Sequence, residues 1–358
     1  MRIPERMAAV RLVAHGGPET LVYAEDVPVP VPGAGEVLIR VAAAGINNTD
    51  INTRIGWYSE TKEGGTAEAR ADTPAPADGG WAGAFVFPRI QGADACGTIV
   101  AVGPGVSAAR VGERVIAQCC LLSLRRGAFV PWLGSERDGA FAQFMAAPAA
   151  DVYRVTAPLT DEQLAAVPCA YATAENLLGR ANVAAGEAVL VTGASGNVGL
   201  AAIQLARVRG AHVVAVASAA KRTALEALGA ARVLDRNARL PEALGAETID
   251  AVIDVVGGPA WPELLTVLKS RGRYAVSGAI AGPVVSLDLR KLYLKDLTFY
   301  GCTAQDAGVF PRLVALLDAG ALAPPVAARF SLKDIQAAQA AFLDKTHVGK
   351  IVLIPPPV

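Results

Sequence analysis

The stretch Val189–Gly210 reads VLVTGASGNVGLAAIQLARVRG, an apolar run followed by a glycine-rich turn and a run of helical length. This order of strand, turn and helix is the context in which a weak glycine pattern becomes specific for a dinucleotide. One glycine lets the backbone approach a pyrophosphate, another lets helix and strand pack closely, and the N–H groups at the helix start meet the phosphate charge. We therefore predict a dinucleotide site at an A-x-G-x-x-G turn formed by Ala194, Ser195, Gly196, Asn197, Val198 and Gly199.

The segments around this turn alternate between Val/Ile-rich runs and helical runs as far as about Gly301. Such alternation is typical of a parallel sheet covered by helices on both faces. Thr160 is placed to cap the helix that opens this region. The sequence therefore predicts an α/β fold with a doubly wound Rossmann domain over residues 156–305. Its expected strands are Ala188–Thr192, His212–Ala217, Ala231–Leu234, Ala251–Val255, Arg273–Ser277 and Leu297–Tyr300.

Residues 1–155 have a different pattern, in which short β-rich runs are separated by Pro and Gly clusters. The tail is expected to return to this domain, so that residues 306–358 complete it. Glu63–Gly83 is rich in Gly, Ala, Pro and acidic residues without periodicity, which predicts a surface insertion or lid. The expected front strands are Met7–Val13, Glu36–Ala44, Gly97–Val102 and Arg114–Ala117, and the expected tail elements are two helices, Gly308–Leu317 and Leu332–Asp344, and a strand, Gly349–Leu353.

Composition limits the partners of the chain. Lys plus Arg and Asp plus Glu both number 33, so no net field favours nucleic acid or an acidic membrane. The N-terminus lacks the apolar core of a signal peptide, and no apolar stretch reaches bilayer-spanning length. The five cysteines form neither a paired framework nor a C-x-x-C knuckle, which favours free thiols in a reducing compartment. We therefore expect a cytoplasmic protein with a small-molecule ligand.

The segment after the second strand indicates which dinucleotide binds. An NAD enzyme usually places Asp or Glu about twenty residues beyond the glycine pattern, to hold the ribose 2′-hydroxyl. That region, Val216–Arg222, contains no acid. Ser218 can donate to a 2′-phosphate, and Lys221 and Arg222 can neutralise it. We therefore predict NADP(H), with a solvated helix start as the alternative explanation of the two basic residues.

Several motifs lie along the chain, namely Gly45–Asp50 (GINNTD), Gln91–Gly97 (QGADACG) with Ile99–Gly103, Asp138–Ala142, Ala184–Gly199 and His347–Ile351. Through these motifs, nearly the whole chain resembles the medium-chain dehydrogenase/reductase superfamily, and within it the quinone oxidoreductase branch. The resemblance implies an oxidoreductase with a GroES-like, β-rich catalytic domain beside the Rossmann domain.

The resemblance also bears on the metal. Zinc-type members hold catalytic zinc with a Cys, a His and another Cys, and the first two matching positions here are Asn47 and Ala93. Cys169 stands at the third position, and one thiolate does not make a stable tetrahedral centre. We expect no metal. The alternative, whose spacing matches no ligand pattern, is a site assembled from Asp94, Cys96, Cys119, Cys120 and Cys169.

Without zinc, the carbonyl of a saturated ketone has no Lewis acid to stabilise an alkoxide, whereas a quinone or enone delocalises the incoming charge. We therefore predict hydride transfer from NADPH to a quinone or α,β-unsaturated carbonyl, with a proton from solvent or a nearby hydroxyl. By resemblance, Asn47, Asp50 and Tyr58 line the nicotinamide cleft. Asn47 is a candidate hydrogen-bond donor to substrate and Asp50 a loop-fixing residue, while Tyr58 is either cleft wall or loop packing. Asn52 stands where a tyrosine is common.

The same resemblance implies further cofactor contacts. Arg236 should join Ser218 and Lys221 near the 2′-phosphate, where it either pairs with the phosphate or stacks on adenine. The ends of the fourth and fifth predicted strands open the crevice of a doubly wound sheet and should touch the ribose and nicotinamide. The residues at those ends are Val255, Val256, Ser277, Gly278 and Ala279, and later cofactor-wall positions are matched by Cys302, Thr303 and Lys350.

Three other functions stay open at this point. A cluster of basic residues near the cleft would favour an enoyl-thioester reductase, and Arg125, Arg126 and Arg137 are candidates for it, with a solvated loop as their alternative explanation. A zinc-type alcohol dehydrogenase is a second alternative, and a non-catalytic NADPH-binding or structural protein is a third. We also expect a homodimer, because the strand that matches Leu297–Tyr300 pairs edge to edge in dimers of proteins that the chain resembles.

Overall fold

A computed structural model describes residues 2–62, 64–66, 79–80 and 85–358. These residues divide into two compact units. The first contains residues 2–62, 79–80, 85–169 and 310–358, and the second contains residues 64–66 and 170–309. Most of the predicted insertion Glu63–Gly83 lies outside the described residues.

The described part of the second unit is built on six parallel strands in the order β11-β10-β9-β12-β13-β14. The strand order reverses between β9 and β12, which creates the crevice where ligands bind in doubly wound sheets. The predicted α/β fold is confirmed, and the strands are β9 (Ala188–Val191), β10 (His212–Ala217), β11 (Arg232–Asp235), β12 (Ile249–Asp254), β13 (Leu268–Val276) and β14 (Thr298–Gly301).

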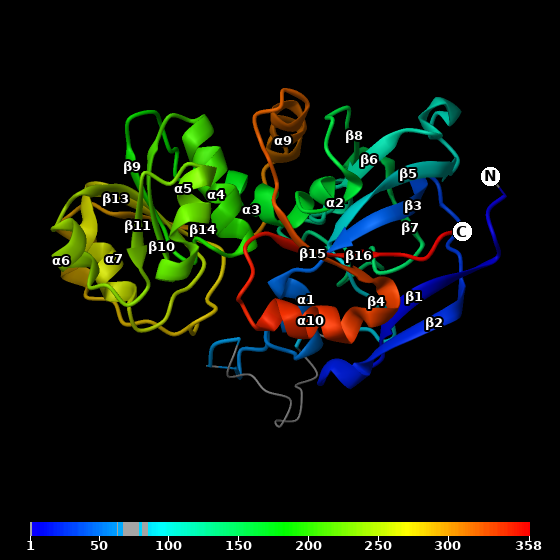
Figure 1. The fold of residues 1–358 in the computed structure, drawn as a ribbon, viewed down its shortest axis with the longest axis horizontal. Helices are drawn as coiled ribbons and strands as arrows, with labels where there is room; N and C mark the ends of the chain where they lie inside the picture. The colour runs from blue at the N-terminus through cyan, green and yellow to red at the C-terminus, as the bar shows by residue number, and fades with distance from the viewer. Residues whose placement is uncertain (1, 63, 67–78, 81–84) are drawn as a thin grey trace. The chain divides into compact units, whose positions relative to one another are not determined.

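Helices bury the apolar strands of this sheet (Figure 1). One core cluster packs Leu190 of β9 and Val252 of β12 against side chains of α7. The rings of Trp261 and Tyr274 meet edge to face with their centroids 5.7 Å apart. Burial on both faces explains why the central strand β9 is a continuous apolar run. The helices are α3 (Pro168–Arg180), which begins in the first unit, α4 (Asn197–Val208), α5 (Arg222–Leu228), α6 (Leu240–Leu244), α7 (Trp261–Val267) and α8 (Leu289–Tyr293).

In the described part of the first unit, one sheet has the order β15-β16-β3-β5-β6-β8, with β7 also paired to β3, and a smaller sheet has the order β2-β1-β4. Figure 1 shows β16, in red, beside the blue β3, and the two strands pair antiparallel. The tail residues 310–358 therefore belong to the first unit. The strands are β1 (Arg6–Leu12), β2 (Leu21–Pro28), β3 (Glu36–Gly45), β4 (Arg89–Ile90), β5 (Asp94–Val102), β6 (Arg114–Ala117), β7 (Phe144–Pro148), β8 (Val152–Arg154), β15 (Val326–Ser331) and β16 (Lys350–Ile354).

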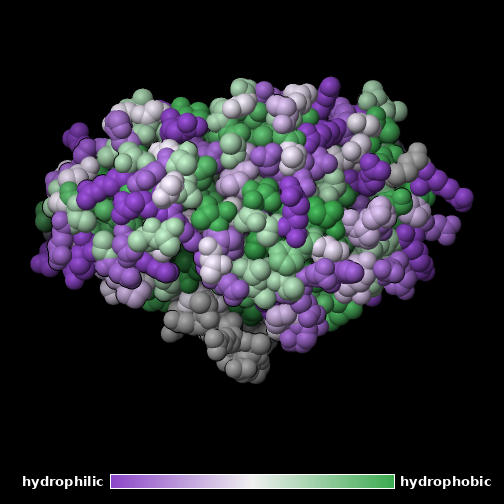
Figure 2. Space-filling view, viewed as in Figure 1, coloured by the Kyte–Doolittle hydropathy of each residue, from purple (hydrophilic) through white to green (hydrophobic). Residues whose placement is uncertain are grey.

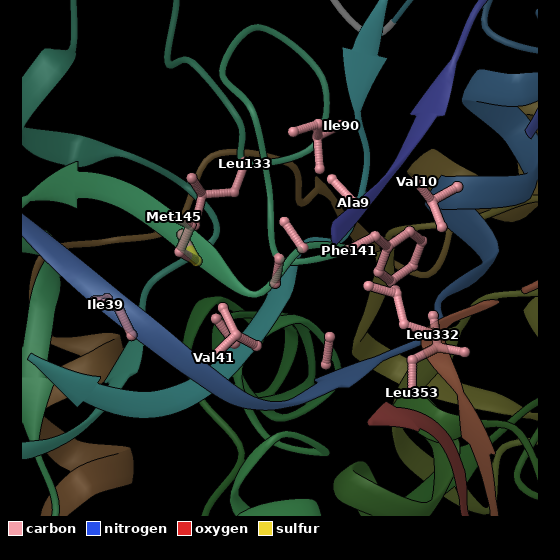
Figure 3. Close-up of a cluster of buried hydrophobic side chains, with 14 of the residues drawn as sticks. Ala9, Val10, Ile39, Val41, Ile90, Leu133, Phe141, Met145, Leu332 and Leu353 are labelled. Atoms are coloured by element: carbon pink, nitrogen blue, oxygen red, sulfur yellow. The ribbon is translucent and has the colours of Figure 1, made fainter. Parts of the chain in front are cut away.

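The core of the first unit joins segments that are far apart in sequence (Figure 3). Ile39 and Val41 of β3 lie in one cluster with Phe141, with Leu332 before α10, and with Leu353 of β16. All five side chains are at most 5% exposed. The helices of this unit are α1 (Asn48–Arg54), α2 (Asp161–Leu164), α9 (Val309–Asp318) and α10 (Ile335–Leu343).

The region around α2 differs from the predicted domain boundary at residue 155. Thr160 does cap a helix, since its hydroxyl accepts from the N–H of Gln163 and the Gln163 side chain accepts from the N–H of Thr160. However, α2 packs on β3 and β5, so the first unit continues through Cys169. This contact lies between residues distant in sequence, where a composition change gives no signal.

The face shown in Figure 2 mixes hydrophilic and hydrophobic residues, and the outer side of α6 and α7 is mostly hydrophilic. Throughout the described ranges, each helix is too short or too polar to cross a bilayer.

Candidate functional site

The predicted dinucleotide turn connects β9 to α4. Gly193 has a φ of +55°, which reverses the chain after the strand, and Gly196 is the exposed N-cap residue of α4. The N–H groups of a first helical turn have no acceptor within the helix, and the helix dipole makes that end attractive to anions. Ser195, Asn197 and Val198 are partly exposed there. The turn therefore has the backbone geometry that suits a pyrophosphate.

The two later glycines of the pattern have different surroundings. A Cβ on Gly199 would lie 2.5 Å from the Cα of Ala194 and 2.5 Å from the carbonyl oxygen of Gly193. Both neighbours are backbone atoms, so a side chain would push α4 away from the turn. A Cβ on Gly196 would meet the Gly193 carbonyl oxygen at 3.3 Å and would otherwise face open space among the described residues. Gly199 thus serves helix packing, while Gly196 leaves its outer side accessible.

Basic residues lie beside this turn at the ends of β10 and β11. The Nζ of Lys221 donates to Oγ of Ser195 over 3.5 Å, and Ser218 precedes the short 3-10 turn that carries Lys221. Burial and the nearby guanidinium of Arg236 both lower the pKa of Lys221. Arg222 instead approaches Glu226 within its own helix, at 3.8 Å. Ser195, Lys221 and Arg236 are therefore close together, whereas Arg222 is directed along α5.

An acidic residue in this area was missed by the sequence analysis. Asp235, at the end of β11, accepts hydrogen bonds from the N–H of Ala219 at 3.2 Å and of Asn237 at 2.9 Å. It fixes the turn that carries Lys221. The sequence analysis considered only the residues that follow β10. Because β10 and β11 pair in parallel, Asp235 at the end of β11 lies next to the end of β10.

The predicted nicotinamide wall lies at the carboxyl ends of β12, β13 and β14. The N–H of Ser277 donates to the carbonyl of Asp254, and the N–H of Cys302 donates to the carbonyl of Val276. The Cys302 side chain is buried and Thr303 is exposed. The predicted residues Val255, Val256, Ser277, Gly278 and Ala279 are all partly exposed at this edge.

The first unit contains a buried polar cluster around Asn47. The Nζ of Lys350 forms an ion pair with Oδ2 of Asp94 and donates to Oδ1 of Asn47 over 2.6 Å. The Nδ2 of Asn47 donates to the same Asp94 oxygen over 2.8 Å. The side chains of Lys350 and Asp94 are 1% and 0% exposed. Both ends of the Asn47 amide are thus engaged inside the protein.

The backbone around this cluster is shaped to admit the lysine. A Cβ on Gly45 would lie 2.3 Å from Cε of Lys350 and 2.6 Å from Oδ2 of Asp94. The other carboxylate oxygen of Asp94 accepts from the N–H of Cys169 over 2.6 Å. The sequence analysis assigned Lys350 to the cofactor wall and Asp94 to an alternative metal site. The structure joins them as an ion pair, and a cofactor contact of Lys350 stays a prediction.

Asp50, in the first turn of α1, contacts this cluster through Asn47. Its Oδ2 accepts from the N–H of Asn47 over 2.7 Å, which with the Asn47 side chain forms the capping box of α1. Burial raises the pKa of Asp50 to about 7, helped by the Asp94 charge and opposed by the Asn47 N–H and by Lys350. Asp50 therefore holds the start of α1 and titrates near neutral pH.

This titration predicts a pH dependence of stability. The folded state keeps a proton on Asp50 to about pH 7, compared with an ordinary pKa of 3.8, so Asp50 contributes stability at low pH that is lost as pH rises through 7. Asp50→Asn, which cannot ionise, should remove this contribution. We expect the unfolding free energy of the wild type to fall relative to that of Asp50→Asn between pH 4 and 7, measured by urea titration. The exposed Asp344→Asn is the control, and a parallel pH course in wild type and Asp50→Asn would refute the assignment.

Two hydroxyl groups lie next to the Asn47 cluster. Tyr58 donates to Oγ1 of Thr49 over 3.1 Å, and both residues are partly exposed. Burial raises the pKa of Tyr58, so its phenol stays protonated. Thr49 was missed, although it stands inside the GINNTD motif next to Asp50. A hydroxyl pair of this kind can donate a hydrogen bond to a carbonyl oxygen.

The donor set does not fit tetrahedral zinc. All five cysteines are buried free thiols, and burial raises the pKa of Cys119 well above its usual value. The ammonium of Lys350 forms an ion pair with Asp94 and a hydrogen bond with Asn47, and at this position it would repel a divalent cation. Over the residues whose positions are described, no three His, Cys, Asp or Glu side chains are grouped to hold a metal ion. The absence of a metal itself stays a prediction.

Only two of the three arginines proposed to bind a thioester substrate remain without an acidic partner among the ion pairs of the described residues. Arg137 forms an ion pair with Glu36 at 2.6 Å. Arg125 and Arg126 are exposed, and Nε of Arg125 donates to the carbonyl of Gly127. Two of the three arginines therefore face solvent beside each other.

Comparisons with known proteins agree with this architecture. An "alcohol dehydrogenase GroES-like domain" model matches residues 33–157, and a "zinc-binding dehydrogenase" model matches residues 197–319. The chain is 31% identical to the acryloyl-coenzyme A reductase of Metallosphaera sedula, covering 92% of this chain and 95% of the relative. It is 30% identical to the quinone oxidoreductase of Lama guanicoe, covering 97% of each.

Solved structures have the same fold. A protein of Sinorhizobium meliloti 1021 that carries the provisional name alcohol dehydrogenase is 45% identical, with a TM-score of 0.89 over 99% of this chain and 98% of that chain. A mycobacterial protein in complex with NADPH is 29% identical, with a TM-score of 0.76 over 98% of this chain and 100% of that one. Both resemblances span the two units.

Proposed function

Because the chain belongs to the medium-chain dehydrogenase/reductase superfamily, in its quinone oxidoreductase-like branch, we propose that this oxidoreductase uses NADPH to reduce a quinone or an α,β-unsaturated carbonyl without zinc. The observation that carries the proposal is the buried contact of Lys350 with Asn47 and Asp94. It engages the residue at the first zinc-ligand position, while Ala93, at the second, offers no ligand atom.

The contact of Lys350 with Asn47 and Asp94 favours a conjugated substrate over a saturated ketone. Reduction of a saturated ketone creates a localised alkoxide, which zinc stabilises in zinc-type enzymes. A conjugated acceptor spreads the same charge and needs hydrogen-bond donors instead. Tyr58 and Thr49 supply a linked pair of hydroxyls in the first unit. We assign them to hold the substrate oxygen and to pass it a proton.

The second unit would hold the cofactor. The exposed N-terminus of α4 at Gly196 suits the pyrophosphate, and Ser218, Lys221 and Arg236 suit a 2′-phosphate. When bound, the nicotinamide supplies the hydride. The mycobacterial neighbour in complex with NADPH supports this choice of dinucleotide.

Lys221 provides a test of that choice. A 2′-phosphate placed between Lys221 and Arg236 would relieve their repulsion, so Lys221→Ala should weaken NADPH binding about tenfold or more and leave NADH binding nearly unchanged. Fluorescence titration of both coenzymes gives the two dissociation constants. Arg222→Ala should have a smaller effect, because Arg222 is directed toward Glu226. Equal losses for NADPH and NADH in Lys221→Ala would rule out the 2′-phosphate contact.

An enoyl-thioester reductase is the second candidate. The relative from Metallosphaera sedula is an acryloyl-coenzyme A reductase, and the exposed pair Arg125 and Arg126 would suit the phosphates of such a substrate. The chemistry is closely related, because a thioester-conjugated double bond also accepts hydride at carbon. The double substitution Arg125→Ala/Arg126→Ala should raise KM for a thioester and leave KM for a quinone unchanged.

A substrate panel is the decisive experiment. NADPH and NADH oxidation would be followed with quinones, enones, enoyl thioesters and saturated ketones, in metal-free buffer and with added zinc. Turnover of quinones or enones with NADPH supports the proposal. Turnover of ketones that requires zinc would favour a zinc-type alcohol dehydrogenase, and NADPH binding without any turnover would favour the non-catalytic alternative.

We also propose a homodimer that acts in the cytoplasm. Among the described residues, β14 is an edge strand of its sheet, and the preceding segment exposes Val284, Leu289 and Leu294 at 64–71%. Exposed apolar groups beside an unpaired strand edge favour association. Sedimentation of the wild type and of Leu289→Asp would test this. The free thiols agree with a reducing compartment.

A further inference from the structure

A buried carboxylate lies at the point where the strand order of the second unit reverses. Asp254 ends β12 and is 0% exposed. Its Oδ1 accepts from the hydroxyl of Thr192 at 2.5 Å and from the N–H of Val256 at 2.8 Å. Its Oδ2 accepts from the phenol of Tyr274 at 2.6 Å, and the N–H of Gly257 approaches both oxygens at 3.2 and 3.3 Å.

These donors come from three neighbouring strand ends. Thr192 directly precedes the glycine-rich turn, Val256 and Gly257 form the loop after β12, and Tyr274 lies in β13. Burial and the Asp254 charge raise the pKa of Tyr274, so the phenol keeps its proton and remains a donor. The carboxylate of Asp254 is therefore surrounded inside the unit by hydrogen-bond donors that are all neutral.

The loop that Asp254 holds is in close contact with the glycine-rich turn. Gly257 and Gly258 have φ values of +61° and +71°, so the chain bends sharply after Val256. A Cβ on Gly193 would approach the side chains of Val255 and Val256 to 3.0 Å. The hydroxyl of Thr192 also accepts from the N–H of Val255 at 3.2 Å. Asp254 and Thr192 thus fix the loop against the turn.

We propose that Asp254 is a positioning residue for the nicotinamide half of the cofactor and that its charge favours the oxidised form. The proposal rests on the dinucleotide site proposed above. By holding the main chain of Val255–Gly257, Asp254 gives the wall its shape before the cofactor arrives. A buried anion at this crevice is attracted to the positive ring of NADP⁺ and not to the neutral ring of NADPH, and hydrogen bonds reduce but do not abolish this attraction. The bound nicotinamide should therefore be a stronger hydride donor.

The test compares binding of the two redox forms in the absence of substrate. Asp254→Asn removes the charge and turns one acceptor into a donor that faces N–H or O–H groups. We expect its dissociation constant to rise about tenfold or more for NADP⁺ and about threefold for NADPH, which shifts the ratio of the two constants about threefold. Calorimetric or fluorescence titration gives both constants without turnover.

Asp250→Asn is the matched control. Asp250 lies near the opposite end of the same strand, where its carboxylate accepts from Nζ of Lys269 and from the N–H of Ala188, both at 2.8 Å. This variant should lose stability and keep the wild-type constants for both redox forms. If Asp254→Asn changes both constants by the same factor, or changes neither, the charge effect is wrong.

A second pair of variants keeps the proposal testable if Asp254→Asn does not fold. Thr192→Val removes one donor and the link to Val255 but keeps the carboxylate, whereas Thr192→Ser keeps the hydroxyl. We expect Thr192→Val to weaken both redox forms and Thr192→Ser to restore binding, and equal binding by the two would overturn the positioning role. A wild-type protein that binds neither NADPH nor NADP⁺ would instead refute the dinucleotide site itself.

Discussion

Replacing Lys350 by Met should lower the free energy of unfolding by about 3–5 kcal/mol, because it leaves the carboxylate of Asp94 buried without its partner. Methionine fills a similar volume without the charge, so the loss reports the ion pair and not a cavity. Asn47 would also lose the donor to its Oδ1. Urea unfolding at neutral pH measures the effect.

Two variants serve as controls for this prediction. Lys269→Met breaks the ion pair with Asp250, in which the lysine side chain is 43% exposed, and should cost within about 1 kcal/mol. The double variant Lys350→Met/Asp94→Asn removes both charges and should recover part of the stability, because no unpaired ion is then buried. If Lys350→Met is no more destabilising than Lys269→Met, the contact is not the buried ion pair described here.

Gly199→Val should abolish measurable NADPH binding and destabilise the second unit by about 2–4 kcal/mol, because β-branched bulk would be forced into backbone atoms at 2.5 Å. The displacement of α4 would move its first-turn N–H groups away from the pyrophosphate position. Coenzyme titration and thermal unfolding measure the two effects separately. Since the clash is with Ala194 and Gly193, the turn itself must shift.

Gly301→Ala is the matched control in the same unit. A Cβ there meets nothing within 4 Å among the described residues. It should bind NADPH like the wild type and unfold at nearly the same temperature. A Gly199→Val protein that folds and binds NADPH normally would show that the packing of α4 on the turn does not position the phosphate site.

The sequence by itself determined the doubly wound sheet and the position of the glycine-rich turn between β9 and α4. Most strands of that sheet contain a short apolar run and are connected by a local helical pattern, so neighbouring residues carry the signal. The strand β10 was predicted with its observed bounds, His212–Ala217. By its resemblance to zinc-type enzymes, the sequence also predicted that Asn47 and Ala93 replace two zinc ligands, and this stays a prediction.

Tertiary structure alone decided what surrounds those positions. Lys350 contacts Asn47 across 303 residues of sequence, and no local pattern encodes such a contact. Asp235 lies beside the turn of Lys221 because β10 pairs with β11. Thr192 and Tyr274 lie beside Asp254 because β12 pairs with β9 and β13. Periodicity specifies which face of an element is buried, whereas the partner of a buried charge depends on how distant strands pair. The dinucleotide turn is therefore encoded locally, and the buried charges that organise both candidate sites are set by the fold.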